Sequence, residues 1–221
     1  MAAVAALLAL PAAAGASPGG VAVPAPEADE PAAADGFTVT AKRSVWLGKR
    51  ISIRGQAPSP HAKVKIQAKT PGGAWRTIGA AEAGDERSFS TKWAPESPGR
   101  FALRAVLAEA SGSSSSAGPA SSSHELLVFR PLIATWYGPG FFGRETACGM
   151  KLTKETKGVA HRSLPCGTKV AISYGGRETV APVIDRGPFA NGADYDLTQA
   201  TARELDVKAT VKVGALPLRD R

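Results

Sequence analysis

Between Phe37 and Pro131 the chain carries short runs in which apolar and polar residues alternate, and this feature limits the fold most. Alternation with a period of two is typical of β-strands that bury one face. Gly and Pro separate the runs, and the whole chain holds 24 Gly and 17 Pro, which suit many turns and few long helices. The pattern predicts an all-β protein with a β-sandwich over residues 37–130.

The predicted strands of this half are FTVTAKRSVWL, KRISIRGQA, AKVKIQAKT, WRTIGAAEA, RSFSTKWAP, GRFALRAVLAEA and HELLVFRP. The patterns W-x-x-I-G, F-x-x-x-W and P-G-x-F-x-L-R within them resemble bacterial immunoglobulin-like modules. We therefore predict an Ig-like sandwich with four aromatic residues in its core, namely Trp75, Phe89, Trp93 and Phe101. No cluster of His, Asp or Glu indicates catalysis here, so spacing or wall attachment is the expected role.

The N-terminal residues predict export. Residues 1–17 join an apolar run to small residues, as in a signal peptide, and are too short to span a bilayer. The first basic residue is Lys42, although signal peptides open with basic residues, so we expect the natural start to lie upstream; an Ala-rich leader is the alternative. Residues 18–36 are rich in Pro, Ala and acids and predict a disordered linker. No cysteine follows the leader, so lipid anchoring is not expected.

The net charge of +8 favours anionic polymers as partners. For an exported protein, the teichoic or peptidyl groups of a cell wall are a better match than nucleic acid. The alternative is that scattered Lys and Arg only keep the surface soluble. Cys148 and Cys166 are the only two cysteines, and an even count in an exported chain indicates one disulfide. With His161 they make an incomplete metal-ligand set, so we expect no metal and no cofactor.

From residue 132 onward the pattern predicts strands at 133–137, 158–161, 169–174, 179–184 and 211–215. Tyr174-Gly175-Gly176-Arg177 predicts a hairpin turn. Thr198 is a good N-cap for a helix over residues 199–205, which Asp196 and Leu197 would open. A small β-barrel with one or two short helices is the economical fold.

Four motifs of this half occur in order: A-T-W-Y-G-P-G-F-x-G-R-x-T-A-C-G, V-A-H-R-S-L-P-C-G-T-K-V, V-I-D-R-G-P-F and Y-D-L-T. They resemble the double-psi β-barrel of the rare lipoprotein A family and, more distantly, barwin proteins and expansins. The resemblance covers residues 132–215 and implies a six-stranded double-psi barrel over residues 131–216, with a tail at 217–221. It also implies action on peptidoglycan, because family members include lytic transglycosylases that leave an anhydro-muramic end.

The resemblance places the expected catalytic residues at Asp185, His161 and Asp196. Asp185 matches the family's D-R-G-P aspartate and an expansin aspartate held essential for wall loosening; the alternative is a cap on the following turn. His161 would orient Asp185 or contact substrate. Asp196, in Y-D-L-T, is equally well explained as a helix cap.

The sequence departs from the family at two acidic positions, which hold Met150 and Thr153. Neither side chain transfers a proton, so cleavage would need a neighbour such as Glu145. Cys148 replaces the family's serine and, with Cys166, resembles a disulfide-bearing subgroup.

The expected substrate-binding residues are Thr135, Tyr137, Phe141 and Arg186. Aromatic faces stack on sugars, although core packing is the alternative for the aromatic residues of this loop. Arg186 would pair with a peptide-stem carboxylate or lock its own turn.

The sequence leaves two main functional hypotheses. The first is a secreted or wall-associated lytic transglycosylase; the second is an expansin-like module that binds or loosens the wall without cleavage. The partner in both is peptidoglycan or another wall polysaccharide, with no nucleic acid and no membrane span.

Overall fold

The structure is a computed structural model that describes residues 36–108, 119–189 and 192–218. The predicted signal peptide and all but the last residue of the predicted linker lie outside these ranges. The elements of the first half, up to β8, are β1 (Thr38–Thr40), β2 (Ser44–Trp46), β3 (Ile51–Gln56), β4 (Lys63–Lys69), β5 (Arg76–Glu82), β6 (Ser88–Trp93), β7 (Gly99–Leu107) and β8 (His124–Tyr137). The all-β prediction is confirmed, and every predicted run of this half contains a strand.

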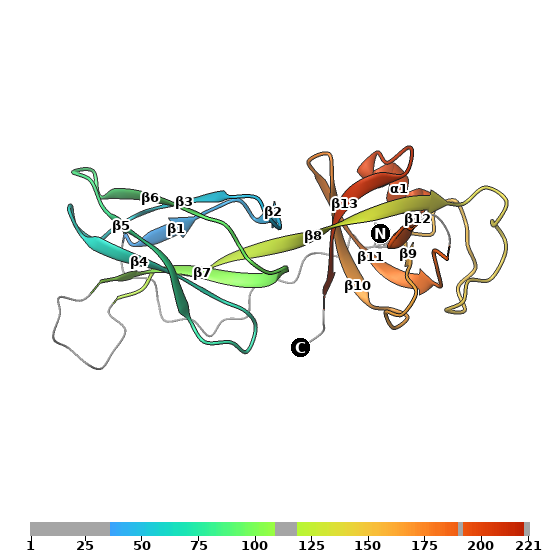
Figure 1. Cartoon of the computed structure of the whole chain (residues 1–221), viewed down its shortest axis with the longest axis horizontal. Helices are drawn as coiled ribbons and strands as arrows, with labels where there is room; N and C mark the ends of the chain where they lie inside the picture. Colours follow the sequence, from blue (N-terminus) through green and yellow to red (C-terminus); the bar gives the residue numbers. More distant parts are fainter. Residues whose placement is uncertain (1–35, 109–118, 190–191, 219–221) are drawn as a thin grey trace, which may run out of the picture.

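Two sheets share one core in the first half (Figure 1). One sheet has the order β1-β3-β6, and the other joins β5, β4, β7 and the first part of β8, with β2 paired parallel to β8. Alternate residues such as Ile51 and Ile53 of β3 are buried, while Ser52 and Arg54 face outward. The immunoglobulin-like assignment of these sheets stays a prediction.

The aromatic residues of the first half do not all lie in the core. Phe89 and Phe101 are buried, and Trp93 packs against the core with its ring edge-on to Phe101. The prediction for Trp75 was wrong: it is partly exposed, with Lys69 Nζ 4.6 Å from its ring centroid. Trp75 precedes the first residue of β5, so the strand alternation that predicted its burial does not reach it.

The second half is a closed barrel of six strands. Its remaining elements are β9 (Val159–Ala160), β10 (Lys169–Tyr174), β11 (Arg177–Asp185), β12 (Tyr195–Thr198), α1 (Gln199–Leu205) and β13 (Val211–Leu218). The strand order β12-β9-β11-β10-β13-β8 closes because β12 also pairs with β8. The helix begins where predicted, since the Thr198 hydroxyl accepts a hydrogen bond from the Thr201 N–H.

The prediction that Asp196 and Leu197 open the helix was wrong. They belong to β12, which runs parallel to the end of β8 with Asp196 opposite Thr135. A strand of four residues followed at once by a helix offers too little alternation to be recognised, and its pairing partner lies far away in sequence.

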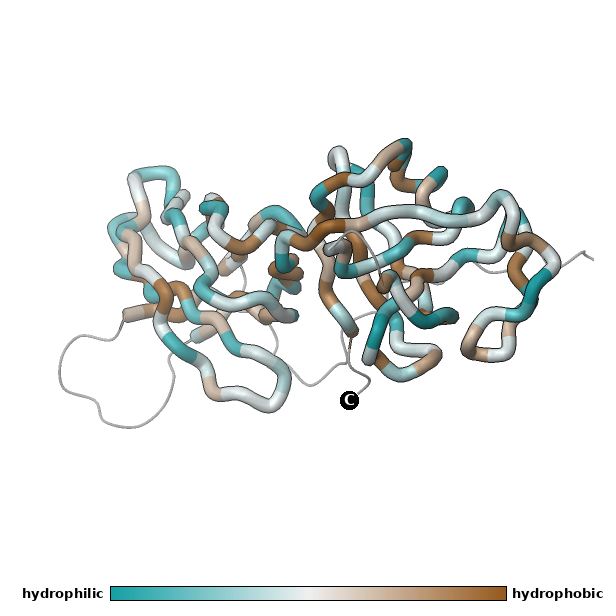
Figure 2. Tube along the Cα trace, turned by 45° about the vertical axis from the view of Figure 1, so that its right-hand side comes forward, coloured by the Kyte–Doolittle hydropathy of each residue, from teal (hydrophilic) through white to brown (hydrophobic). Residues whose placement is uncertain are grey.

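Strand β8 connects the two halves without a break and passes through the predicted boundary at residues 130–131 (Figure 1). Its first part pairs with β7 and β2, and its last part pairs with β13 and β12. Figure 2 shows apolar, brown chain where the halves meet. There Trp46 donates to the Ser173 hydroxyl over 3.3 Å, and a Cβ on Gly214 would lie only 2.6 Å from Trp46 Nε1. The halves therefore pack directly on each other.

Gly158, directly before β9, is bonded to the end of β12 and to α1, and we predict that Gly158→Ala lowers stability. Its N–H donates to the hydroxyls of Thr198 and Thr201, and a Cβ there would lie 2.5 Å from two carbons of buried Ile184. Overpacking of this kind costs about 1–3 kcal/mol. Urea unfolding measures the loss. Gly79→Ala is the control, because the nearest atom to its Cβ is a Thr91 hydroxyl at 3.4 Å; an equal loss in both variants would contradict the packing explanation.

Candidate active site

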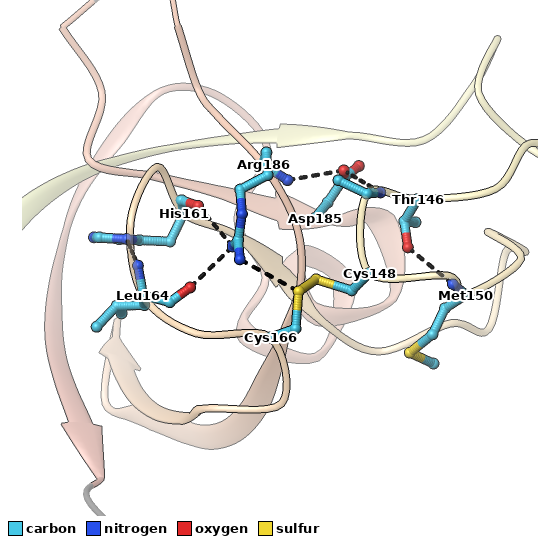
Figure 3. Close-up of a disulfide and its surroundings, with 9 residues drawn as sticks. Thr146, Cys148, Met150, His161, Leu164, Cys166, Asp185 and Arg186 are labelled. Carbon is cyan, nitrogen blue, oxygen red and sulfur yellow. Dashed lines mark hydrogen bonds between the residues drawn. A yellow bond between two sulfur atoms is a disulfide. The ribbon is translucent and has the colours of Figure 1, made fainter.

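Asp185 is the last residue of β11, and its carboxylate is held by the backbone. Oδ1 accepts hydrogen bonds from the N–H of Ala147 over 2.9 Å and from the N–H of Arg186 over 2.8 Å (Figure 3). The bond to Arg186 is the turn cap that the sequence offered as an alternative. The bond to Ala147 is different, because it joins β11 to a separate loop and fixes the carboxylate between two chain segments.

The predicted disulfide between Cys148 and Cys166 is present and lies beside Asp185 (Figure 3). It joins the loop that contains Ala147 to the loop that follows His161, over a sequence separation of 18. The Cys148 N–H also donates to the carbonyl of Ile184 over 3.2 Å. The donor loop of Asp185 is thus tied both to β11 and to the neighbouring loop.

Asp196 supplies a second carboxylate to the site from the adjacent part of the barrel. It is half-buried, and Thr135 Oγ1 donates to its Oδ1 over 2.8 Å. Burial raises the pKa of Asp196 above the usual aspartate value; the Thr135 hydrogen bond opposes this rise, and the negative charge of Asp185 adds to it. The negative charge of Asp185 therefore makes it easier for Asp196 to hold a proton.

Tyr137, at the end of β8, is close enough to both carboxylates for their charges to act on its hydroxyl. Burial raises the pKa of its hydroxyl, and the charges of Asp185 and Asp196 raise it further. The Oη atom is buried and has no hydrogen bond of normal geometry to any described residue, although Asp185 is close enough to act on it. A buried hydroxyl without a partner is costly, and Asp185 is the acceptor to which this one is close.

His161 does not contact the Asp185 carboxylate through its ring. Its Nδ1 accepts from the N–H groups of Ser163 over 3.1 Å and Leu164 over 3.0 Å, and the ring packs on Tyr195 at 4.9 Å between centroids. In Figure 3 the Arg186 side chain lies between His161 and Asp185. Burial lowers the pKa of His161, and the charges of Arg162 and Arg186 lower it further. His161 orders its own loop as a neutral ring.

The Arg186 side chain is engaged within the protein. Its guanidinium donates to the carbonyls of Leu164 over 2.9 Å and His161 over 3.3 Å, and to Cys166 Sγ over 3.3 Å. Of the two roles that the sequence offered, these contacts favour locking of the turn. The pairing of Arg186 with a stem-peptide carboxylate stays a prediction without support from its geometry.

The two positions that depart from the family pattern lie in the loop near the disulfide. Met150 is 43% exposed, and the Thr153 hydroxyl is used within its own turn by Thr156 at 2.9 Å. Glu145 is exposed, and its side chain forms no hydrogen bond or ion pair with another described residue. Nothing brings Glu145 to Asp185 or Asp196, so its predicted catalytic role has no support from the contacts.

Exposed apolar side chains surround this region. Phe141 is 50% exposed and lies edge-on to the Tyr137 ring at 6.1 Å, and Phe189, four residues after Asp185, is 81% exposed. Sequence reasoning identified Phe141 but passed over Phe189, although the F of V-I-D-R-G-P-F was the available signal. In the described part of the chain no group of three or more His, Cys, Asp or Glu side chains is arranged for a metal ion. Residues 36–108, 119–189 and 192–218 also contain no helix with the length and hydropathy of a membrane span.

A family model described as lytic transglycolase matches residues 130–219. Those residues form the closed six-stranded barrel and contain both carboxylates. They are an RlpA-like double-psi β-barrel. The probable endolytic peptidoglycan transglycosylase RlpA of Synechocystis sp. is 41% identical over 80 residues, covering 35% of this chain and 25% of that protein.

A second relative of the RlpA-like barrel is the endolytic peptidoglycan transglycosylase RlpA of Campylobacter jejuni. It is 38% identical over 89 residues, covering 39% of this chain and 31% of that protein. The chain therefore spans about a quarter to a third of these relatives. Among solved structures, the Streptomyces papain inhibitor aligns with a TM-score of 0.31 and 23% identity over 39% of this chain and 92% of that one, a likeness too low to carry an argument.

Proposed function

We propose that the RlpA-like barrel cleaves the glycan strands of peptidoglycan as a lytic transglycosylase and works outside the cytoplasm. The observation that carries the proposal is the pair of aspartates. Asp196 has a raised pKa and an oxygen that no described residue binds, and Asp185 is fixed by two N–H donors. The relatives' names support the substrate class, because they describe peptidoglycan transglycosylases.

The proposed reaction needs one transferable proton, and Asp196 carries it. The protonated carboxyl gives its proton to the glycosidic oxygen, the bond from that oxygen to C1 of the muramic residue breaks, and the leaving sugar departs as an alcohol. The resulting carboxylate then takes the proton of the C6 hydroxyl of the same muramic residue. That oxygen attacks C1 and forms the 1,6-anhydro ring, so no water is consumed and Asp196 is protonated again.

In this proposal the other residues position the substrate and Asp196, or stabilise the transition state. The Asp185 carboxylate places negative charge near the cationic character that develops at C1, which is electrostatic stabilisation of the transition state. Tyr137 supports the neighbouring Phe141 ring, and Thr135 orients Asp196. Phe141 provides an exposed aromatic face for a sugar ring. His161 and Glu145 remain candidate catalytic residues, but their contacts assign them no step in this reaction.

A non-cleaving, expansin-like wall binder is the second candidate function. One observation favours it: the two positions that are acidic in Gram-negative family members hold exposed Met150 and turn-forming Thr153. A protein that has lost these groups can still grip glycan through the aromatic and hydroxyl groups near Asp185.

An assay with purified sacculi decides between the two functions. The full chain is incubated with sacculi beside Asp185→Asn, soluble products are analysed by mass spectrometry, and bound protein is measured by sedimentation. We expect anhydro-muropeptides from the native chain, and at least about tenfold less from Asp185→Asn because the charge that stabilises C1 is lost. Bound protein without any soluble product would rule out the enzyme and leave the binder.

A further inference from the structure

A basic groove of about 610 Å³ lies in the first half of the molecule, away from Asp185 and Asp196. Its lining comes from the end of β1, from β2, from the first part of β3 and from the connections between these strands. Four cations line it: Lys42, Lys49, Arg50 and Arg54. Among the described residues no Asp or Glu lines it, and the hydroxyls of Thr40 and Ser52 add donors among the charges.

The four cations are not used inside the protein. Each is exposed, and none forms a salt bridge or a side-chain hydrogen bond with another residue in the described ranges. On the barrel side, the Glu178 carboxylate accepts a hydrogen bond from Ser44, which also lines the groove. Four unpaired cations around one hollow create a positive potential that attracts an anion. Scattered surface charge that serves solubility alone would instead be mixed with acids.

We infer that this groove binds the peptide-stem carboxylates of peptidoglycan, so that the first half of the chain grips the polymer on which the barrel acts. The inference deepens the proposed function and rests on it for the choice of polymer. Arg50 and Arg54 carry planar guanidinium groups, which match a carboxylate with two parallel hydrogen bonds.

The rigid connection of the halves makes such a second contact useful. The groove includes Trp46, which pairs with Phe129 of β8, and β8 continues to Tyr137 at the site. At about 3.4 Å per residue, the stretch from Phe129 to Tyr137 extends about 27 Å. A polymer with repeated carboxylates can occupy both places at once, and the second contact then forms at a high effective concentration.

The test measures binding to sacculi by a chain that does not cleave glycan. In the Asp196→Asn background, the full-length pair Lys49→Gln and Arg50→Gln is compared with Lys65→Gln and Arg76→Gln, which removes one Lys and one Arg from exposed positions of the opposite sheet. Sedimentation with sacculi gives Kd at low salt. We expect the groove pair to weaken binding about fivefold, the size of two exposed ion pairs, and the control pair to leave it unchanged. Near 1 M salt the difference disappears, because screening there acts within about 3 Å.

Chemically treated sacculi identify the anion. Treatment with hydrofluoric acid removes phosphodiester-linked polymers, and carbodiimide coupling to a neutral amine removes the carboxylate charges. We expect the difference in Kd between the chain with the native groove and the groove variant to remain after hydrofluoric acid treatment. The same difference should vanish after carbodiimide coupling. Loss of the difference after hydrofluoric acid, or equal binding by the groove and control pairs, would overturn the inference. Both contradicting results are measured as binding to sacculi. A barrel that binds but fails to cleave glycan would therefore produce neither of them.

Discussion

Asp196→Asn is expected to reduce the release of anhydro-muropeptides from sacculi by about 100-fold or more, which is the usual contribution of a general acid. Asparagine keeps the shape of the side chain and still accepts the hydrogen bond from Thr135, but it has no proton to give. Product release is followed by mass spectrometry across pH. For the native chain we expect the rate to fall as pH rises through the raised pKa of Asp196, because only the protonated form starts the reaction.

The same substitution should raise stability at neutral pH, and this separates lost chemistry from lost folding. The pKa of Asp196 is raised in the folded state, mainly by burial, so the folded chain holds the proton more tightly than the unfolded chain. The native chain therefore loses stability as pH rises from the ordinary aspartate value through the raised one. Asp196→Asn escapes this loss, and its unfolding midpoint should exceed that of the native chain at pH 7 but match it near pH 3.

A matched control for Asp196→Asn is Asp206→Asn, which removes one negative charge at the C-cap of α1. Asp206 is exposed and has a left-handed backbone, which asparagine adopts readily. We expect the control to cleave at the native rate. Native-rate cleavage by Asp196→Asn would instead show that another group donates the proton, and would direct attention to Asp185.

The sequence was most informative where local rules decide the structure. The Gly175-Gly176 pair has positive φ at both residues, as the hairpin prediction requires, and β10 has the predicted bounds of 169–174. The N-cap at Thr198 is equally local. Strand β12 was missed because it exists through its pairing with β8 and β9, and such pairing between distant segments leaves no local pattern.

The candidate site, too, was predictable from the sequence only where a local motif identifies a residue. Asp185 was found from its motif, but the role of Asp196 depends on its register opposite Thr135, which only the closed barrel establishes. The ring orientation of His161 and the contacts of Arg186 depend on how one loop folds onto the end of β11. The basic groove carries no motif, because its cations come from β3 and from the two connections that join β1, β2 and β3, and they look in the sequence like ordinary surface charge.

Removing the disulfide with Cys148→Ala and Cys166→Ala is expected to lower the free energy of unfolding by about 3 kcal/mol. The bond closes a loop with a sequence separation of 18, and opening it gives the unfolded chain more freedom. Urea unfolding of the full chain measures the loss.

Activity should fall as well when the disulfide is removed, because the Ala147 N–H that holds Asp185 precedes Cys148 directly. Its loop would then be attached to β11 only through two hydrogen bonds, from Ala147 N–H to Asp185 and from Cys148 N–H to Ile184. A reductant should shift the native chain to the midpoint of the double variant and leave the variant unchanged. Coincident midpoints for the native and variant chains without reductant would contradict a stabilising role. The loops around Asp185 would then be held by the Arg186 hydrogen bonds to Leu164 and His161, and the disulfide would be dispensable for the geometry of the site.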